Sequence, residues 1–181
     1  IREIPDATRR LLSEGREAIE IAADDLRHTA PQFISTVARG SSDHAATYFK
    51  YASELTLGLP VASIGPSISS IYGADLLLGN SACIGISQSG QSPDIVKMTQ
   101  SATKQGALTV AITNEPASPL ADACKHTIPI HAGTERSVAA TKTFVTSAVA
   151  GLALLAHWKQ DKHLLEAIEK LPKHLENAVF Y

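Results

Sequence analysis

The chain has 181 residues, of which 44% are hydrophobic and 19% charged, and its formal net charge is −2. This length is enough for one domain with a substantial core, and this composition excludes an intrinsically disordered chain. Lys and Arg are scattered rather than gathered in a stripe, so we expect no nucleic-acid partner and no binding to an anionic membrane.

Cysteine usage and the absence of a leader-like pattern point to the cytoplasm. Cys83 and Cys124 do not form a Cys-x-x-Cys pair, and we interpret both as reduced, mostly buried thiols. Residues 1–12 are charged and lack the apolar segment of a signal peptide. The most apolar stretch, 144–158, contains Thr146, Ser147 and His157 and is too short and too polar to span a bilayer.

Hydrophobic periodicity predicts an alternation of helices and short strands. A first helix is expected over 5–26, where apolar residues recur at helical spacing. The expected strands are 33–38, 61–64, 82–86, 108–113 and 127–130. The expected later helices are 44–57, 92–105, 120–124, 139–158 and 164–171, with a weak helical turn over 69–75 and an interruption at Pro172.

Strands of four to six residues that alternate with helices predict a parallel, right-handed, doubly wound sheet. The expected fold class is therefore α/β, a three-layer sandwich in which a five-stranded parallel sheet is flanked by helices. We expect one domain over residues 1–160, including the N-terminal helix, and a helical tail over residues 161–181.

Hydroxyl-rich loops follow two of the predicted strands. Gly40-Ser41-Ser42 follows the first strand, and Ser87-Gln88-Ser89-Gly90-Gln91-Ser92 follows the third. Each loop precedes a predicted helix, whose free N–H groups and dipole favour an anion. Because ligands of open α/β sheets bind at the carboxyl ends of the strands, the two loops predict a phosphorylated small-molecule ligand. Ordinary helix N-capping by Ser42 and Ser92 is the alternative interpretation.

A third polar loop, residues 133–142, opens the long predicted helix. Glu135 and Lys142 are the one acid and the one amine in these loops of an obvious catalytic type, and both are weak candidates because surface or capping roles explain them better. His131 lies beside this loop, and a solvated or hydrogen-bonded role competes there with a catalytic one.

Other functional classes fit the sequence poorly. The turn after the first strand, 39–44, has a single glycine and lacks the dinucleotide-binding fingerprint, and no P-loop motif is present. Residues 85–89 approach the Gly-x-Ser-x-Gly elbow of serine hydrolases, but Ser89 stands where the second glycine is required. No two histidines are spaced four residues apart, so we expect no metal site. Because the nucleotide-binding motifs are missing as well, we expect no cofactor.

At these three loops the chain resembles the SIS (sugar isomerase) domain family. It is most similar to the isomerase half of glucosamine-6-phosphate synthase and to short proteins with two SIS domains. Three blocks carry the resemblance: 39–42, 87–92 and 132–142. The resemblance implies a five-stranded parallel sheet flanked by helices. It implies phosphate contacts from Ser87, Gln88, Ser89 and Ser92, and sugar contacts from Gly40, Ser41, Ser42, Val138 and Ala140.

The chain departs from the synthase pattern at two positions. Arg39 stands where the pattern has Cys, and Ala140 stands where it has Ser. A lost hydroxyl and an added guanidinium suggest an altered substrate. Arg39 either pairs with a charged substrate group or forms a salt bridge within the protein.

The resemblance implies a domain that binds a hexose 6-phosphate or an amino-sugar phosphate, such as fructose 6-phosphate or glucosamine 6-phosphate. The chain is then part of an aldose–ketose isomerase or an amino-sugar-phosphate deaminase, aminotransferase-like but without a glutaminase domain. Family members with two SIS domains keep most catalytic residues in the second one, to which the tail 161–181 is expected to lead. A homodimer is also expected. The alternative is a non-catalytic SIS module that senses a sugar phosphate.

Overall fold

The structure, a computed structural model, describes residues 1–136 and 140–179. Its centre is a five-stranded sheet in the order β2-β1-β3-β4-β5, in which every neighbouring pair is parallel. The strands are β1 (Phe33–Ala38), β2 (Val61–Ser63), β3 (Ser81–Ser87), β4 (Leu108–Thr113) and β5 (His126–Pro129). The predicted α/β class is therefore confirmed, with strand ends that differ by at most one residue.

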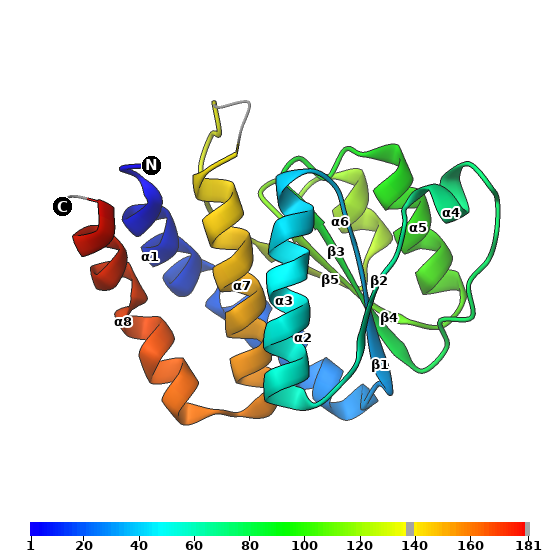
Figure 1. Ribbon diagram of the computed structural model, residues 1–181, viewed down its shortest axis with the longest axis horizontal. Coiled ribbons are helices and arrows are strands. Elements are labelled where there is room, and N and C mark those ends of the chain that lie inside the picture. Colours follow the sequence, from blue (N-terminus) through cyan, green and yellow to red (C-terminus); the bar gives the residue numbers. More distant parts are fainter. Residues whose placement is uncertain (137–139, 180–181) are drawn as a thin grey trace.

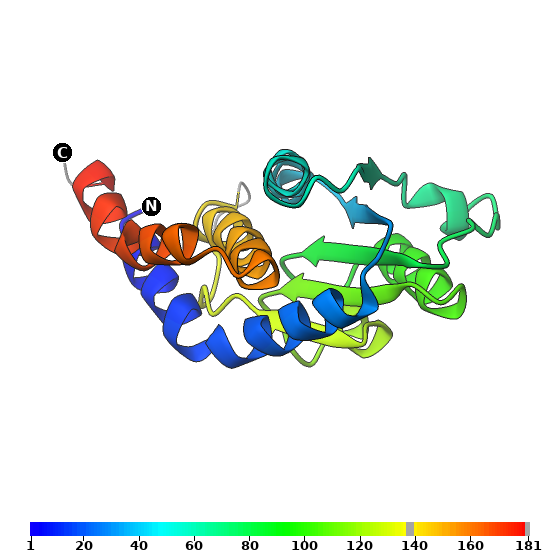
Figure 2. The ribbon, with the colours of Figure 1, turned by 90° about the horizontal axis from the view of Figure 1, so that it is seen from below.

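Helices cover both faces of this sheet and form a three-layer sandwich (Figures 1 and 2). They are α1 (Ile4–Glu14), α2 (Arg16–Thr29), α3 (Ser41–Leu57), α4 (Ser67–Ser70), α5 (Pro93–Lys104), α6 (Pro119–Ala123), α7 (Lys142–Lys159) and α8 (Lys162–Val179). Figure 2 shows α2, α3 and α7 on one face and α4, α5 and α6 on the other. Helices α1 and α8 pack outside α7.

Two apolar clusters fill the spaces between the layers because strand side chains alternate in direction. On β3, Ile84 and Ile86 belong to the cluster under α2, α3 and α7, whereas Cys83 belongs to the cluster under α5. All three side chains are fully buried. Burial raises the pKa of the Cys83 thiol to about 11, so this cysteine is an inert core residue, as expected.

The single helix predicted over 5–26 is wrong: the structure has two helices that meet at Gly15. A Cβ at this position would lie 2.7 Å from the carbonyl oxygen of Leu11 and 3.1 Å from that of Pro129 at the end of β5. The close approach requires glycine at the junction of the two helices, although the apolar spacing continues through it.

The interruption predicted at Pro172 is also wrong, because α8 runs through this residue to Val179. Proline removes one helical hydrogen bond, but the helix continues on both sides and its apolar side packs against α1. Among the described residues, no helix combines the length and the apolar character that crossing a bilayer requires.

The strand order places a switch point at the carboxyl edge of the sheet. β1 lies between β2 and β3, so the chain turns to opposite sides of β1 after these two strands. It leaves β1 through α3 on one face of the sheet and leaves β3 through α5 on the other face. Residue 38 at the end of β1 pairs with residue 86 near the end of β3. The loops that follow these two strands therefore flank the crevice in which open α/β sheets bind ligands.

Candidate functional site

The loop that follows β3, residues 87–92, is a compact turn that its own serines hold together. The Gly90 N–H donates to the Ser87 Oγ at 3.1 Å, and the Gln91 N–H donates to the Ser89 Oγ at 3.3 Å. Ser87 is buried, whereas Gln88, Ser89 and Ser92 are partly exposed. The predicted phosphate-binding residues are thus gathered in one turn, here called the phosphate loop.

Neighbouring elements fix the phosphate loop from behind. The Gln88 carbonyl accepts from the Asn114 N–H at 3.1 Å, and the Gly90 carbonyl accepts from the Leu120 N–H at 3.1 Å. Gly90 has φ +62° and packs directly on the side chain of Ser118. A side chain at position 90 has no room there, so the loop depends on glycine for both its conformation and its contact with α6.

Helix α5 begins at the end of the phosphate loop with its first N–H groups uncommitted to a capping side chain. Ser92 occupies the N-cap position in an extended conformation, but its hydroxyl does not cap the helix. Pro93 follows at the first helical position, where its missing N–H costs nothing. Ser92 therefore occupies the N-cap position, but the capping hydrogen bond that the alternative interpretation requires is not formed. A helix start of this kind is chemically suited to an anion.

The loop after β1 is shorter and turns on Gly40. Gly40 has φ +56° and is itself the N-cap of α3, so Ser42 is not the cap. Ser41 and Ser42 lie in the first turn of α3, and both are partly buried. These predicted sugar-contacting residues therefore follow β1, the strand that pairs with β3, and lie at the same edge of the sheet as the phosphate loop.

Arg39 links the end of β1 to the start of α5. Its Nη1 lies 3.1 Å from the Asp94 Oδ2 in the first turn of α5, and its side chain remains 62% exposed. Of the two roles expected for Arg39, the structure shows the salt bridge within the protein.

Asn114, which directly follows β4, holds the start of the third loop. Its Nδ2 donates to the Gly133 carbonyl at 2.9 Å, and its Oδ1 accepts from the Ala132 N–H at 2.9 Å. Arg10 of α1 donates to the His131 carbonyl at 3.0 Å, and Glu14 lies 3.3 Å from the His131 Nδ1. His131 is thus a paired, hydrogen-bonded residue. Sequence reasoning missed the role of Asn114, although its position directly after the fourth predicted strand, at the same edge of the sheet, was the available signal.

Glu135 caps α7. Its Oε2 accepts from the N–H groups of Thr141 and Thr143 at 3.1 and 3.2 Å and from the Thr143 hydroxyl at 3.2 Å. Partial burial by itself raises the pKa of this carboxyl. These hydrogen bonds and the charge of Lys142 outweigh the burial, so the pKa lies below its ordinary value. A carboxylate with a lowered pKa is a poor general base near neutral pH.

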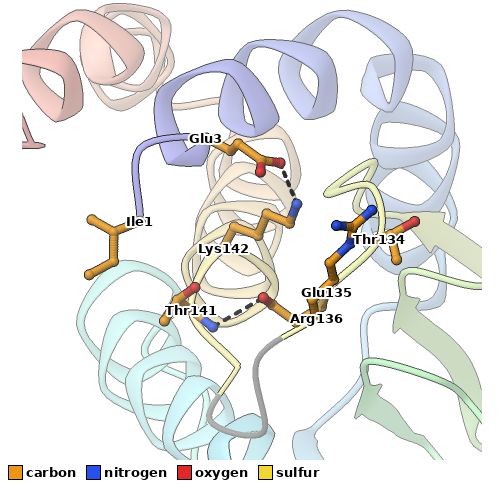
Figure 3. Close-up of a pocket in the computed structure, with 7 residues that line it drawn as sticks. All are labelled: Ile1, Glu3, Thr134, Glu135, Arg136, Thr141 and Lys142. Carbon is orange, nitrogen blue, oxygen red and sulfur yellow. Dashed lines mark hydrogen bonds and ion pairs between the residues drawn. The ribbon is translucent and has the colours of Figure 1, made fainter.

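Lys142 is buried and paired with Glu3, which precedes α1. Figure 3 shows its amino group directed at the Glu3 carboxylate, beside a cavity of about 390 Å³ that Glu135 also lines. The hydrogen bond and charge of Lys142 hold the pKa of Glu3 below its ordinary value. Both weak catalytic candidates thus have structural partners at the start of α7.

The third loop reaches the same edge of the sheet as the serine loops. Helices α3 and α7 lie side by side and both begin at this edge (Figure 1). Ala140 is partly buried just before α7, whereas Val138 lies outside the described residues. Within residues 1–136 and 140–179, no three His, Cys, Asp or Glu side chains gather as metal ligands would.

Comparisons with known proteins agree with this architecture. A family model described as the SIS domain matches residues 31–157. The chain is 32% identical over 179 residues to the isomerizing glutamine–fructose-6-phosphate aminotransferase of Methanothermobacter thermautotrophicus, a match that covers 99% of this chain and 29% of that protein.

Among solved structures, a candidate phosphosugar isomerase of Silicibacter pomeroyi DSS-3 is 58% identical with a TM-score of 0.96, over 98% of this chain and 54% of that one. A protein of E. coli CFT073 in complex with A5P is 17% identical with a TM-score of 0.64, over 90% of this chain and 93% of that one, and shares the fold. The chain spans less than a third of the aminotransferase and about half of the S. pomeroyi protein. Because the family model matches most of its length, the chain belongs to the SIS domain family.

Proposed function

We propose that this chain binds a sugar phosphate of the hexose 6-phosphate or amino-sugar phosphate class. The observation that carries the proposal is the phosphate loop: three serines and Gln88 gather at the start of α5, and the Ser92 hydroxyl does not cap that helix. Neutral hydroxyls and N–H groups at a helix start suit a phosphate dianion. The relatives named as acting on fructose 6-phosphate and on phosphosugars support the same ligand class.

In this proposal the sugar extends from the phosphate loop toward Ser41 and Ser42 and toward the third loop. The strand register supports the first contact, because the loops follow adjacent strands. Ala140, at the end of the third loop, is the matching residue on the α7 side. Anchoring the phosphate fixes the opposite end of the sugar relative to a catalytic group, which removes much of the entropic barrier of the reaction.

The chemistry we propose is proton transfer between C1 and C2 by a general acid/base, as in an aldose–ketose isomerase or an amino-sugar-phosphate deaminase. Glu135 and Lys142 are committed to capping α7 and to Glu3. We therefore propose that other groups supply the base. We also propose that residues 161–181 lead from the SIS domain, residues 1–160, toward a second domain, since the S. pomeroyi protein is about twice as long as the part that this chain matches. Homodimerisation and a cytoplasmic location remain predictions.

The test is to incubate the chain with fructose 6-phosphate or glucosamine 6-phosphate and to follow both interconversion and ammonia. Saturable binding is expected for both sugars. Turnover would show that the chain is itself catalytic, whereas binding without turnover would mean either a sensing module or a catalytic group outside the chain. Absence of binding to both sugars would contradict the proposed function.

A further inference from the structure

A cleft of about 500 Å³ adjoins the phosphate loop on the α5 face of the sheet. It lies between α4 and the start of α5, which pack side by side (Figure 1). Pro93 and Asp94, which directly follow the phosphate loop, form one wall, and Ser67 of α4 stands on another. Arg39, which precedes Gly40 and Ser41, closes the side next to the sugar-contacting loop. A ligand at the phosphate loop would therefore have this cleft as its immediate neighbour.

The cleft differs from the phosphate loop in its charge. Arg39 and Lys97 line it together with one carboxylate, Asp94, which leaves an excess of one positive charge. The phosphate loop contains no charged residue. A second cleft of about 420 Å³, beside the third loop, has the opposite character because Glu14, Glu115 and Glu135 line it with one arginine. The positive cleft is thus a local feature of a chain whose net charge is −2.

Asp94 orients Arg39 without using up its donors. The Asp94 Oδ2 forms the ion pair with the Arg39 Nη1 at 3.1 Å, and the Oδ1 is buried with no hydrogen-bond partner among the described residues. Arg39 is therefore the group that neutralises this carboxylate, which holds the guanidinium at the mouth of the cleft. A guanidinium carries five N–H donors, and the Arg39 side chain is 62% exposed. Donors remain for a carboxylate or phosphate oxygen while the Asp94 contact persists.

We propose that this cleft binds a second anionic group of the ligand, with Arg39 and Lys97 as its charge partners and Asp94 as the residue that positions Arg39. The chain then prefers sugar phosphates that carry a further carboxylate or phosphate over those with one phosphate alone. This inference rests on the proposed function, because the first phosphate must occupy the phosphate loop.

The experiment compares three probes at fixed ionic strength by isothermal titration calorimetry: fructose 6-phosphate, fructose 1,6-bisphosphate and 6-phosphogluconate. The last two separate a phosphate from a carboxylate as the second anion. At least one of them is expected to bind about tenfold more tightly than fructose 6-phosphate, the gain typical of one charge-assisted hydrogen bond. Arg39→Ala and Lys97→Ala are each expected to remove most of this preference and to leave fructose 6-phosphate affinity within about twofold. Arg16→Ala, which removes an exposed arginine paired with Glu169 elsewhere, is the matched control and is expected to change nothing.

Two results overturn the inference while leaving the proposed function intact. One is equal affinity for all three probes. The other is an equal loss for all three in Arg39→Ala, which would place Arg39 at the first phosphate. If none of the probes binds the wild-type chain, the proposed function itself fails.

Discussion

The backbone of Gly90 packs directly against the side chain of Ser118. A Cβ at position 90 would lie 2.5 Å from the Ser118 Cβ and closer still to its Oγ. This contact joins the phosphate loop to the start of α6, where the Ser118 hydroxyl also accepts from the Ala121 N–H. The loop is thereby fixed by packing as well as by its own hydrogen bonds.

Gly90→Ala is expected to destabilise the fold and to distort the phosphate loop. The substitution strains a backbone with φ +62° and forces a clash with Ser118, and we expect a loss of about 2–4 kcal/mol in the free energy of unfolding. Gly106→Ala is the matched control, because Gly106 has φ +87° but nothing within 4 Å of a Cβ. Urea denaturation measures both. Equal losses in the two variants would show that the Ser118 contact has no energetic role.

Glu135→Ala is expected to destabilise α7 by about 1 kcal/mol, as the loss of a capping side chain does. Glu135→Gln retains an acceptor oxygen and is expected to lose less. Glu166→Ala, at an exposed position on α8, serves as the control in the same denaturation series. Unchanged stability of Glu135→Ala would remove the capping role and return Glu135 to the list of catalytic candidates.

Asp25→Asn is expected to lower stability at neutral pH and to have no effect in strong acid. Hydrogen bonds from Lys125 and then His126 hold the pKa of the Asp25 carboxyl below its ordinary value of 3.8, although burial opposes them. Because the folded-state pKa is the lower one, the contribution is complete above pH 3.8 and disappears as the pH falls through the folded value. The pair is near the surface, so we expect less than about 1 kcal/mol.

Thermal unfolding of wild type and Asp25→Asn between neutral pH and strong acid measures this dependence. A difference between the two proteins that grows as the pH falls below 3.8 would contradict the assigned sign.

The sheet was predictable because its strands are short buried runs. β4, for example, spans the predicted residues 108–113, and all six are buried. The break at Gly15 was not predictable, because the apolar spacing of α1 and α2 is continuous. The crowding that requires glycine there comes partly from Pro129 on a distant strand. Pro172 shows the reverse: a local helix-breaking signal that the packing of α8 overrides.

For the candidate site, sequence order was enough to place the serine loops at one edge of the sheet. It could not reveal that Asn114 holds the start of the third loop by hydrogen bonds to Ala132 and Gly133. Nor could it choose between the two roles of Arg39, because Asp94 becomes its neighbour only when β1 and β3 pair. The residues that position the loops thus depend on tertiary contacts, whereas the loops themselves have a local pattern.

The most direct test of the central claim is the dissociation constant of fructose 6-phosphate for wild type, Ser89→Ala and Ser13→Ala, measured by calorimetry with unphosphorylated fructose as a second ligand. Ser13 is an exposed serine on α1 whose hydroxyl donates to the Arg9 carbonyl of the same helix, and it is the control. We expect saturable binding of fructose 6-phosphate, no comparable binding of fructose, a loss of about tenfold or more in Ser89→Ala, and no change in Ser13→Ala. Equal affinity of wild type and Ser89→Ala, or equal binding of fructose and its phosphate, would contradict the assignment of residues 87–92 as a phosphate site.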